Sequence, residues 1–373
     1  MKKTTATIRA AAIGAIALLA LTSCAANEGG SNGSNGSSDS GNNSASSLNG
    51  TLNGGGASSQ GAAQEVWIAE FQTAHSKVNI NYDPSGSGAG RETFQQGASA
   101  FAGSDRAFKV SEIEKGPFQS CAVDSGIVEF PAYISPIAIV FNVEGIDKLN
   151  LDADTVAKIF SGQIKKWNDP AIADQNKDAK LPDLNITAVH RSDKSGTTGN
   201  FTEYLTAAAP EAWTAGSVEE WPTELGGEGA SQTSGMIDAV SNGVGMIGYA
   251  DASRAGKLGT VSIKVGDKYV GYSPEAAAAI VDKSKVEDGR TAHDIAIKLD
   301  RTSTESGVYP IVLVSYLIGC ETYKNSADAE LVKAYFSYIV SEQGQGAAAK
   351  KAGNAPLSTT MRSKIETAIA AIK

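Results

Sequence analysis

From residue 48 onward, short apolar or alternating runs are separated by stretches in which apolar residues recur every three or four positions. The runs predict strands, since four to eight such residues suit an extended chain in a sheet. The predicted strands cover residues 48–52, 78–82, 101–104, 127–130, 137–141, 186–190, 245–249, 261–265 and 311–318. The last run, IVLVSYLI, is apolar almost throughout, which predicts a strand buried on both faces.

The stretches with helical spacing predict helices between these strands. In one of them Trp67 and Phe71 lie four residues apart, and in another Asp152 or Asp154 can cap the helix that carries Phe160. The predicted helices cover residues 63–74, 85–94, 156–160, 201–208, 327–341 and 359–372. Because strands alternate with helices, we expect the α/β class with largely parallel sheets.

The first residues of the chain follow a different pattern. Three basic residues and no acidic one precede an apolar run at residues 10–21, which is too short to span a bilayer and is typical of an export signal. The run ends in Leu-Thr-Ser-Cys, which resembles the lipobox of bacterial lipoproteins. We therefore expect residues 1–23 to be a lipoprotein signal peptide and Cys24 to carry a lipid anchor. A secretory signal with an incidental cysteine is the alternative.

A segment of low complexity follows the predicted anchor. Residues 29–47 contain seventeen Gly, Ser or Asn in nineteen positions, too few apolar groups to offset the entropy of ordering. We expect residues 24–47 to be a flexible tether between a membrane surface and the folded part.

Charge and cysteine content narrow the function classes. The 373 residues include 32 Lys and Arg against 41 Asp and Glu, a formal net charge of −9 that falls to −12 once residues 1–23 are removed. This balance argues against nucleic acid as a partner. Three cysteines exclude a disulfide-rich scaffold. We expect Cys121 and Cys320 to form one disulfide, with two buried free thiols as the alternative.

Four loops that follow predicted strands are rich in Gly, Ser, Thr or Asp. They are residues 54–59 (GGGASS), 85–90 (SGSGAG), 103–105 (GSD) and 190–197 (HRSDKSGT). Ligands of α/β proteins bind at the carboxyl ends of strands, and the free N–H groups of helix N-termini there hold anions. Three such turns that converge would suit a small tetrahedral oxyanion.

Each loop also has an ordinary structural explanation when it is taken alone. Ser58 and Thr197 are equally suited to cap helices, and Asp105 to cap a turn. Arg191 alone would be a surface charge. The Gly-rich segment is no Walker A loop, because the pattern G-x-x-x-x-G-K-[ST] is absent from the sequence.

Together, these segments resemble the phosphate-binding proteins of bacterial phosphate-specific ABC transporters, which have the type II periplasmic-binding-protein fold. The R-x-D-x-S-G-T element at residues 191–197 is the most specific match. Further matching segments are IKKWND at 164–169, WP at 221–222 with GGEG at 226–229, and GVGMIGY at 243–249. The resemblance runs from about residue 48 to the end of the chain.

The resemblance implies a set of phosphate ligands. Ser58 and Ser87 would supply hydroxyl and N–H groups and Ser59 an N–H, while Asp105 would be the only carboxylate that faces the anion. The remaining ligands would be Arg191, Ser195, Gly196 and Thr197, with Asp193 holding the guanidinium. Two positions depart from the family pattern: Ser59-Gln60-Gly61 replaces an aromatic residue and prolines, and Lys194 stands where many members have Gly.

A carboxylate beside an oxyanion is repulsive unless the ligand carries a proton. Phosphate near neutral pH can donate a hydrogen bond to Asp105, whereas sulfate cannot. A buried acceptor without a partner costs about 1–3 kcal/mol or more. We therefore expect Asp105 to distinguish two ions of nearly equal size.

The resemblance implies a two-lobed clamp with two crossovers. Residues 48–135 and 306–373 would form domain one, and residues 136–305 domain two. Phosphate would bind between them, on the outer face of the cytoplasmic membrane, and the closed form would meet the membrane permease. No cofactor, metal or catalytic residue is expected.

Three other functions remain open at this point. One is a phosphatase or esterase that uses Ser87 or Ser195, although His75, His190 and His293 are far apart in sequence and match no metal motif. The others are a binding protein for another oxyanion and an adhesive surface lipoprotein.

Overall fold

The computed structural model describes residues 48–373, so the predicted signal peptide, Cys24 and the tether lie outside the described residues. The strands are β1 (Gly50–Gly56), β2 (Val78–Asp83), β3 (Phe101–Ser104), β4 (Ile127–Phe141), β5 (Lys148–Leu151), β6 (Thr187–Arg191), β7 (Glu228–Ala230), β8 (Met246–Asp251), β9 (Gly259–Val265), β10 (Lys268–Val270), β11 (Lys285–Val286), β12 (Ile297–Lys298) and β13 (Val312–Cys320).

The α-helices are α1 (Gly61–Ala74), α2 (Ser87–Gln95), α3 (Val110–Lys115), α4 (Ala153–Phe160), α5 (Pro170–Ala173), α6 (Gly196–Ala208), α7 (Gln232–Asn242), α8 (Pro274–Lys283), α9 (Ser326–Val340), α10 (Glu342–Ala352) and α11 (Thr359–Ala370). Short 3-10 turns are η1 (Ser58–Gln60), η2 (Thr223–Leu225) and η3 (Ala252–Arg254). Within residues 48–373, none of the helices is long and apolar enough to cross a membrane.

The main sheet has the strand order β2-β1-β3-β13-β4-β8-β6-β7, and β9 joins β4 and carries β5 and β10. The pairings β1–β2, β1–β3, β6–β7 and β6–β8 are parallel, as the α/β pattern predicts. The middle of the sheet, β3-β13-β4-β8, is antiparallel. The expectation of largely parallel sheets was therefore wrong there, because β4 and β13 run in opposite directions past each other.

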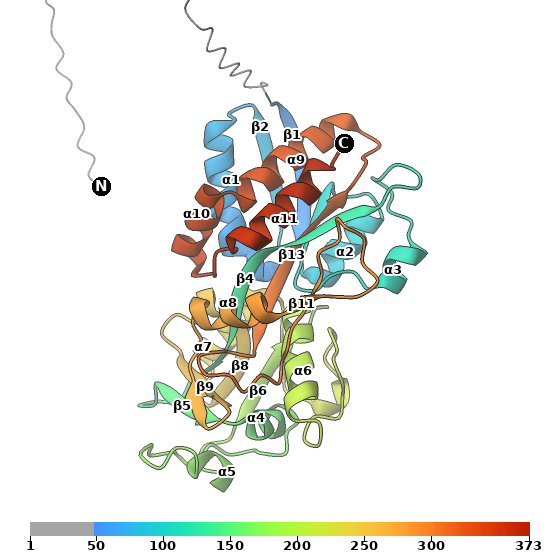
Figure 1. Ribbon diagram of the computed structural model, residues 1–373. Helices are drawn as coiled ribbons and strands as arrows, with labels where there is room; N and C mark the ends of the chain where they lie inside the picture. The colour runs from blue at the N-terminus through green and yellow to red at the C-terminus, as the bar shows by residue number, and fades with distance from the viewer. Residues whose placement is uncertain (1–47) are drawn as a thin grey trace, which may run out of the picture. The chain divides into compact units, whose positions relative to one another are not determined.

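Strand β4 joins the two lobes of the fold (Figure 1). Its first part, up to Pro136, pairs with β13, and its second part, from Ile137, pairs with β8. We refer to β1–β3, β13, α1–α3 and α9–α11 as lobe 1, and to β5–β10 and α4–α8 as lobe 2. The carboxylate of Asp251 accepts a bond of 3.0 Å from the hydroxyl of Tyr133 and ties the end of β8 to β4 at this passage.

The sequence predicted two strands here, on either side of Pro131 and Pro136, and that was wrong. Proline has no N–H for a ladder and is tolerated in a sheet at bulges. The register between β4 and β13 shifts at Ser315 and Tyr316, where Tyr316 pairs with Pro131. The bulge accommodates the proline, and the strand continues for 15 residues.

The core of lobe 1 is aromatic. Phe101 packs against Tyr335 and Phe336 of α9 with ring centroids 5.8 and 5.7 Å apart. Trp67 of α1 is fully buried and donates to the carbonyl of Gly344 in α10 at 2.7 Å. Helices α1, α9, α10 and α11 pack together beside the sheet (Figure 1).

Several elements differ from the expected ones. Strand β1 includes Gly54, Gly55 and Gly56, which were expected to follow it. Helix α4 is capped by Asp152, whose carboxylate accepts from the N–H of Thr155 at 2.8 Å, which decides between the two candidates. Helices α7, α8 and α10 were not predicted, since small residues dilute their apolar pattern.

The segment at residues 285–298 lies in the predicted domain two but contacts lobe 1. The N–H of Ile295 donates to the carbonyl of Glu129 in β4 at 2.7 Å, and the N–H of Ile297 donates to the hydroxyl of Tyr316 at 2.9 Å. Arg290 donates to the carbonyl of Phe108 at 2.6 Å. The chain therefore touches lobe 1 before β13 begins.

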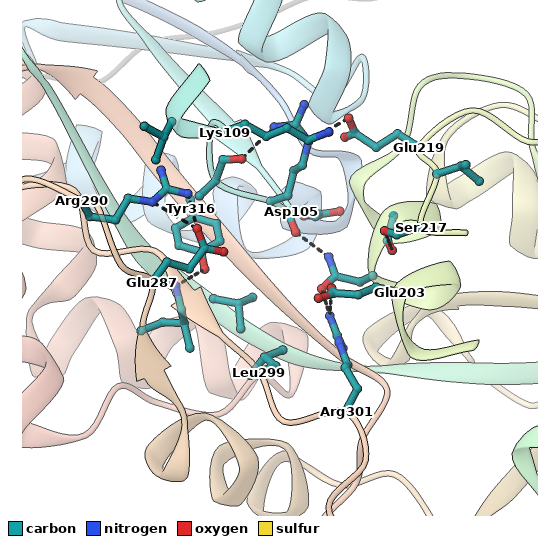
Figure 2. Close-up of a pocket in the computed structure, with 18 residues that line it drawn as sticks. Asp105, Lys109, Glu203, Ser217, Glu219, Glu287, Arg290, Leu299, Arg301 and Tyr316 are labelled. Atoms are coloured by element: carbon teal, nitrogen blue, oxygen red, sulfur yellow. Dashed lines mark hydrogen bonds and ion pairs between the residues drawn. The ribbon is translucent and has the colours of Figure 1, made fainter. Parts of the chain in front are cut away.

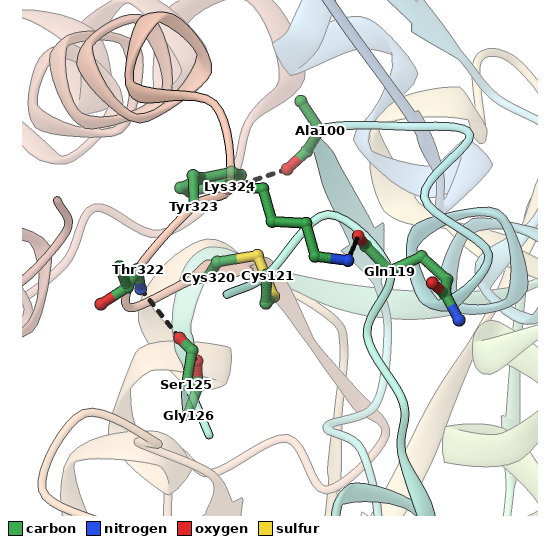
Figure 3. Close-up of a disulfide and its surroundings, with 9 residues drawn as sticks. All are labelled: Ala100, Gln119, Cys121, Ser125, Gly126, Cys320, Thr322, Tyr323 and Lys324. Carbon is green, nitrogen blue, oxygen red and sulfur yellow. Dashed lines mark hydrogen bonds between the residues drawn. A yellow bond between two sulfur atoms is a disulfide. The ribbon is translucent and has the colours of Figure 1, made fainter. Parts of the chain in front are cut away.

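A disulfide joins Cys121 to Cys320, with a sequence separation of 199 residues and the Cα atoms 5.3 Å apart (Figure 3), which confirms the predicted pair. Both cysteines are buried. The neighbouring bonds from the N–H of Thr322 to the hydroxyl of Ser125 and from Lys324 to the carbonyl of Gln119 hold the same two segments together. The bond thus links the segment that precedes β4 to the end of β13.

We expect the double variant Cys121→Ser/Cys320→Ser to lose about 2–5 kcal/mol of unfolding free energy, because the cross-link restricts the unfolded chain. Urea denaturation of the oxidised protein, the reduced protein and the variant measures the loss. The reduced protein is the control and should match the variant. Equal stability of the oxidised protein and the variant would contradict this prediction.

Candidate functional site

The four predicted loops meet between the lobes, and the structure brings all their predicted site residues together. In lobe 1, Ser58 and Ser59 form η1 after β1, Ser87 begins α2, and Asp105 follows β3. In lobe 2, Arg191 ends β6, and Ser195, Gly196 and Thr197 lie at the N-terminus of α6. All the side chains of this set are buried, with at most 8% of each residue exposed.

Asp105 lies at the centre of the site and accepts bonds from three hydroxyls. Ser59 and Ser315 donate to Oδ1 at 2.6 and 2.7 Å, and Thr197 of lobe 2 donates to Oδ2 at 2.8 Å. Burial raises the pKa of Asp105, while these three hydroxyls and the charge of Arg191 oppose the rise. The carboxylate is thus held by donors from both lobes and does not cap its own turn.

Arg191 is held by Asp193. Its Nε donates to Oδ1 of Asp193 at 2.7 Å and its Nη2 pairs with Oδ2. Although burial raises the pKa of Asp193, the guanidinium holds it below its ordinary value. Nη2 also reaches across the lobes to the hydroxyl of Ser58 at 3.2 Å.

The neighbouring His190 points elsewhere, as expected from the alternation of a strand. Its ring stacks on Trp221 with centroids 5.0 Å apart.

Backbone N–H groups supply further donors. In residues 48–373 no hydrogen bond is found for the N–H groups of Ser87, Gly196 and Thr197, which lie in the first turns of α2 and α6. The positive ends of two helix dipoles therefore meet at the site. The hydroxyl of Ser87 accepts from the N–H of Asp105 at 3.0 Å, which leaves its own proton free to be donated.

The capping explanations were wrong for Ser58 and Thr197. Ala57, not Ser58, precedes η1, and the hydroxyl of Ser58 instead contacts Thr233 of α7, 3.0 Å from its Oγ1 and 3.2 Å from its N–H. Ser195 is the N-cap of α6 and accepts from the N–H of Thr198 at 3.2 Å. Thr197 uses its hydroxyl on Asp105, so its N–H is the group left for a ligand.

Two glycines allow the lobes to approach. Gly86 has φ of +105°, and a Cβ there would lie 2.6 Å from a carboxylate oxygen of Asp193. The N–H of Gly88 donates to the carbonyl of Lys194 at 3.1 Å, and a Cβ on Gly88 would lie 2.5 Å from the Lys194 side chain. Lys194 is exposed and covers α2 from lobe 2.

Glu219 of lobe 2 binds two arginines of lobe 1. Arg91 donates to both of its carboxylate oxygens at 2.8 and 2.7 Å, and Arg106, next to Asp105, donates from Nε at 2.8 Å. The carbonyl of Glu219 accepts from the N–H of Ser195 at 3.0 Å. Although burial raises it, the two arginines hold the pKa of Glu219 below its ordinary value. Glu219 therefore couples contact between the lobes to the start of α6.

A cavity of about 380 Å³ lies beside Asp105 and is lined by residues of both lobes (Figure 2). Arg301 lies in its wall and donates to Asn200, whose amide in turn donates to the carbonyl of Asp105. Arg301 also pairs with Glu203 at 2.9 Å, and Arg290 with Asp294 at 3.0 Å. The charges that line this cavity are thus largely paired.

The sequence analysis missed Thr233, Ser315 and Glu219, which come from segments far from the four loops, and Asn200, which lies in α6 just after the fourth loop. One signal existed for Ser315, because it is the only hydrogen-bonding side chain, apart from Tyr316, in the run IVLVSYLI. A polar residue in a strand buried on both faces needs a partner. For Glu219 the sequence carries no comparable signal.

Comparison with known proteins gives consistent matches. The PBP superfamily domain matches residues 40–343. The phosphate-binding protein PstS 3 of Mycobacterium leprae is 34% identical over 333 residues, which cover 86% of this chain and 87% of that protein.

Two solved structures share the fold. A high-affinity periplasmic phosphate-binding protein, PfluDING, bound with phosphate, has a TM-score of 0.67 at 19% identity and covers 85% of this chain and 93% of that chain. A putative phosphate ABC transporter substrate-binding protein with bound phosphate, from Clostridium perfringens, has a TM-score of 0.57 at 20% identity, with 81% and 98% covered.

We expect Glu219→Gln to lower the free energy of unfolding by about 2–4 kcal/mol, because the buried Arg91 loses its charged partner and Arg106 keeps only Glu112. The control is Glu342→Gln, whose side chain is 85% exposed and pairs with Arg362 at 2.7 Å. We expect that change to cost less than about 1 kcal/mol. Urea denaturation measures both, and equal losses would contradict the assigned role.

Proposed function

The chain belongs to the PBP superfamily and, within it, to the PstS phosphate-binding proteins, and from this premise we propose that it captures inorganic phosphate between its two lobes for an ABC transporter. The observation that carries the proposal is the composition of the site. Hydroxyls, free N–H groups and one guanidinium surround a single carboxylate, Asp105. Such a site suits an anion that still carries a proton.

The proposed phosphate ligands are the residues that the family motif indicates, and the local bonds refine their roles. Arg191 supplies charge and Ser87 supplies a hydroxyl, and Ser58 would turn the proton of its hydroxyl from Thr233 to the ligand. Ser59, Gly196 and Thr197 supply N–H groups, since the hydroxyls of Ser59 and Thr197 are bonded to Asp105. Ser195 acts through its place as N-cap, and Asp193 orients Arg191.

The proton that phosphate carries would decide the selectivity of the site for phosphate over sulfate. HPO4(2−) and H2PO4(−) can each donate to Asp105, whereas sulfate would leave a buried carboxylate facing an oxygen lone pair. Sites built for a donor reject analogues without it by factors of roughly 10⁴–10⁵. Arsenate carries a proton too, and we expect it to compete.

A hydrolase that uses Ser87 or Ser195 is less well supported. Such a serine needs a base, and the hydroxyl of Ser195 caps α6. His190 stacks on Trp221, His293 pairs with Glu321 at 2.7 Å, and His75 packs on Phe71. We therefore propose a binding protein and not an enzyme, and a phosphatase assay with added divalent metals, and with chelator, tests this point.

The two lobes would act as a clamp. We keep the proposed domains, residues 48–135 with 306–373 and residues 136–305, as the bodies that move, except that residues 285–298 bond to lobe 1 and would move with it. Bonds across the site, from Thr197 to Asp105 and from Arg191 to Ser58, support a closed form that bound ligand favours. That form would be recognised by the permease.

We also propose where the protein is located in the cell. The chain would be exported, and Cys24 would hold it by lipid to the outer face of the cytoplasmic membrane, with residues 24–47 as tether. We expect Cys24→Ala to move the protein from the membrane fraction to the soluble exported fraction, because the proposed lipid attachment is lost. Immunoblotting of fractions measures this, and Glu342→Gln, a change at an exposed side chain, is the control that should stay in the membrane fraction. Membrane retention of the Cys24 variant would contradict the anchor.

We expect Asp105→Asn to keep phosphate binding and to narrow the preference for phosphate over sulfate by about 100-fold or more, because an amide can donate to sulfate. Competition calorimetry on ligand-stripped protein measures both affinities. The control, Asp193→Asn, removes a charge from the same site and should weaken both anions alike. Unchanged exclusion of sulfate by Asp105→Asn would contradict the role of Asp105.

A further inference from the structure

Four hydrogen bonds in series run from helix α9 to Asp105. The hydroxyl of Tyr335 donates to Gln64 at 2.8 Å, and the Gln64 amide donates to Gln60 at 2.9 Å. The Gln60 amide donates to the hydroxyl of Ser315 at 2.7 Å, and Ser315 donates to Oδ1 of Asp105 at 2.7 Å. All five side chains are at least 98% buried. We call these five hydrogen-bonded side chains the relay. Because they are shielded from solvent, water cannot readily replace the hydrogen-bonding group of any of them.

One backbone carbonyl sets the direction of the relay. The Nε2 group of Gln60 lies 3.0 Å from the carbonyl of Tyr316, which can only accept. This contact fixes the side-chain NH2 group of Gln60 toward β13. The side-chain oxygen of Gln60 therefore faces Gln64, and the NH2 group of Gln64 must be the donor to it. The hydroxyl of Ser315 already accepts from Gln60, and its proton is directed to Asp105. The polarity therefore does not depend on Tyr335.

The direction has a consequence at the carboxylate. Oδ1 accepts from both Ser59 and Ser315, and a carboxylate oxygen has two lone pairs in its plane. Oδ2 accepts from Thr197 alone and retains one lone pair. Oδ2 is thus the oxygen that can still receive a proton from a ligand.

We propose that Ser315, oriented by Gln60 and Gln64, is a specificity-determining positioning residue: by filling Oδ1 of Asp105, it leaves Oδ2 as the single acceptor for the ligand's proton. The inference rests on the proposed function and deepens it. Ser315 acts only through Asp105.

The same bond influences the protonation of Asp105. Burial raises its pKa, and the hydroxyls of Ser59, Ser315 and Thr197 oppose the rise. The titratable groups that face Asp105 from neighbouring elements are Arg191 of β6 and Tyr82 of β2, and Tyr82 stays neutral because burial raises its pKa further. Loss of the Ser315 donor therefore raises the pKa of Asp105. The neutral acid, which forms as pH falls through that pKa, can donate to sulfate.

Ser315→Ala tests this role, with Tyr335→Phe as the matched control. Calorimetry with inorganic phosphate and with sulfate from pH 5 to 8 measures the ratio of the two affinities. We expect Ser315→Ala to narrow the ratio of the phosphate affinity to the sulfate affinity by about 10-fold or more. The carboxylate of Asp105 loses a hydrogen bond to its charged form, so its neutral form, which can donate to sulfate, becomes more accessible. Its sulfate binding should appear at a higher pH than in the wild type. Tyr335→Phe should lower the melting temperature and leave the ratio unchanged.

Ser315→Cys provides a second variant of similar volume with a weak donor, should the alanine variant fail to fold. It should shift the ratio and the pH profile in the same direction. A wild-type ratio and pH profile in both Ser315 variants would overturn the inference, as would an equal change in Tyr335→Phe. Wild-type protein that binds no phosphate would instead overturn the proposed function, and the inference with it.

Discussion

The site depends on the cost of burying one carboxylate. Asp105 is 2% exposed, and a buried charge is tolerated only where hydrogen bonds replace the lost water. Its donors come from η1, from β13 and from α6, so elements of both lobes must be in place together. The same requirement explains polar residues in otherwise apolar surroundings, among them Ser315 in β13 and Gln60 at the end of η1. The fold around the site is arranged to supply these donors.

The connections between the lobes hold the donors around Asp105 in place. Strand β4 passes from lobe 1 to lobe 2 without a break, and β13 runs beside its first part. The disulfide joins the end of β13 to the segment that precedes β4, and the bond from Tyr133 to Asp251 fastens the passage between the lobes. Glu219 of lobe 2 then binds Arg91 and Arg106 of lobe 1, and its carbonyl accepts from the N–H of Ser195 at the start of α6. The proposed anion ligands are thus held by elements that are themselves fastened to one another.

Much of this could be predicted from the sequence where the signal is local. Gly, Ser and Asp after apolar runs indicated all four loops, and the family motif assigned Arg191 to the site, where the alternation of strand faces allows only one of His190 and Arg191. Features that depend on contacts between distant parts of the chain could not be predicted from the sequence. The sequence suggested a break in β4 at Pro131, because the bulge that accommodates it is set by β13, about 180 residues later in the chain. Ser195, and not Thr197, caps α6, since Thr197 is drawn to Asp105 in the other lobe. Ser315, Thr233 and Glu219 gain their roles only from partners that the fold brings near.

The contact of Gly88 with Lys194 bears on how such a protein could be turned into an optical reporter. The two backbones meet here by a hydrogen bond, and a Cβ at position 88 would lie 2.5 Å from the Lys194 side chain, which would have to shift. In the proposed clamp, a residue larger than glycine at position 88 would therefore oppose closure. A dye meant to sense closure of the proposed clamp therefore belongs away from this contact, where added atoms would displace Lys194.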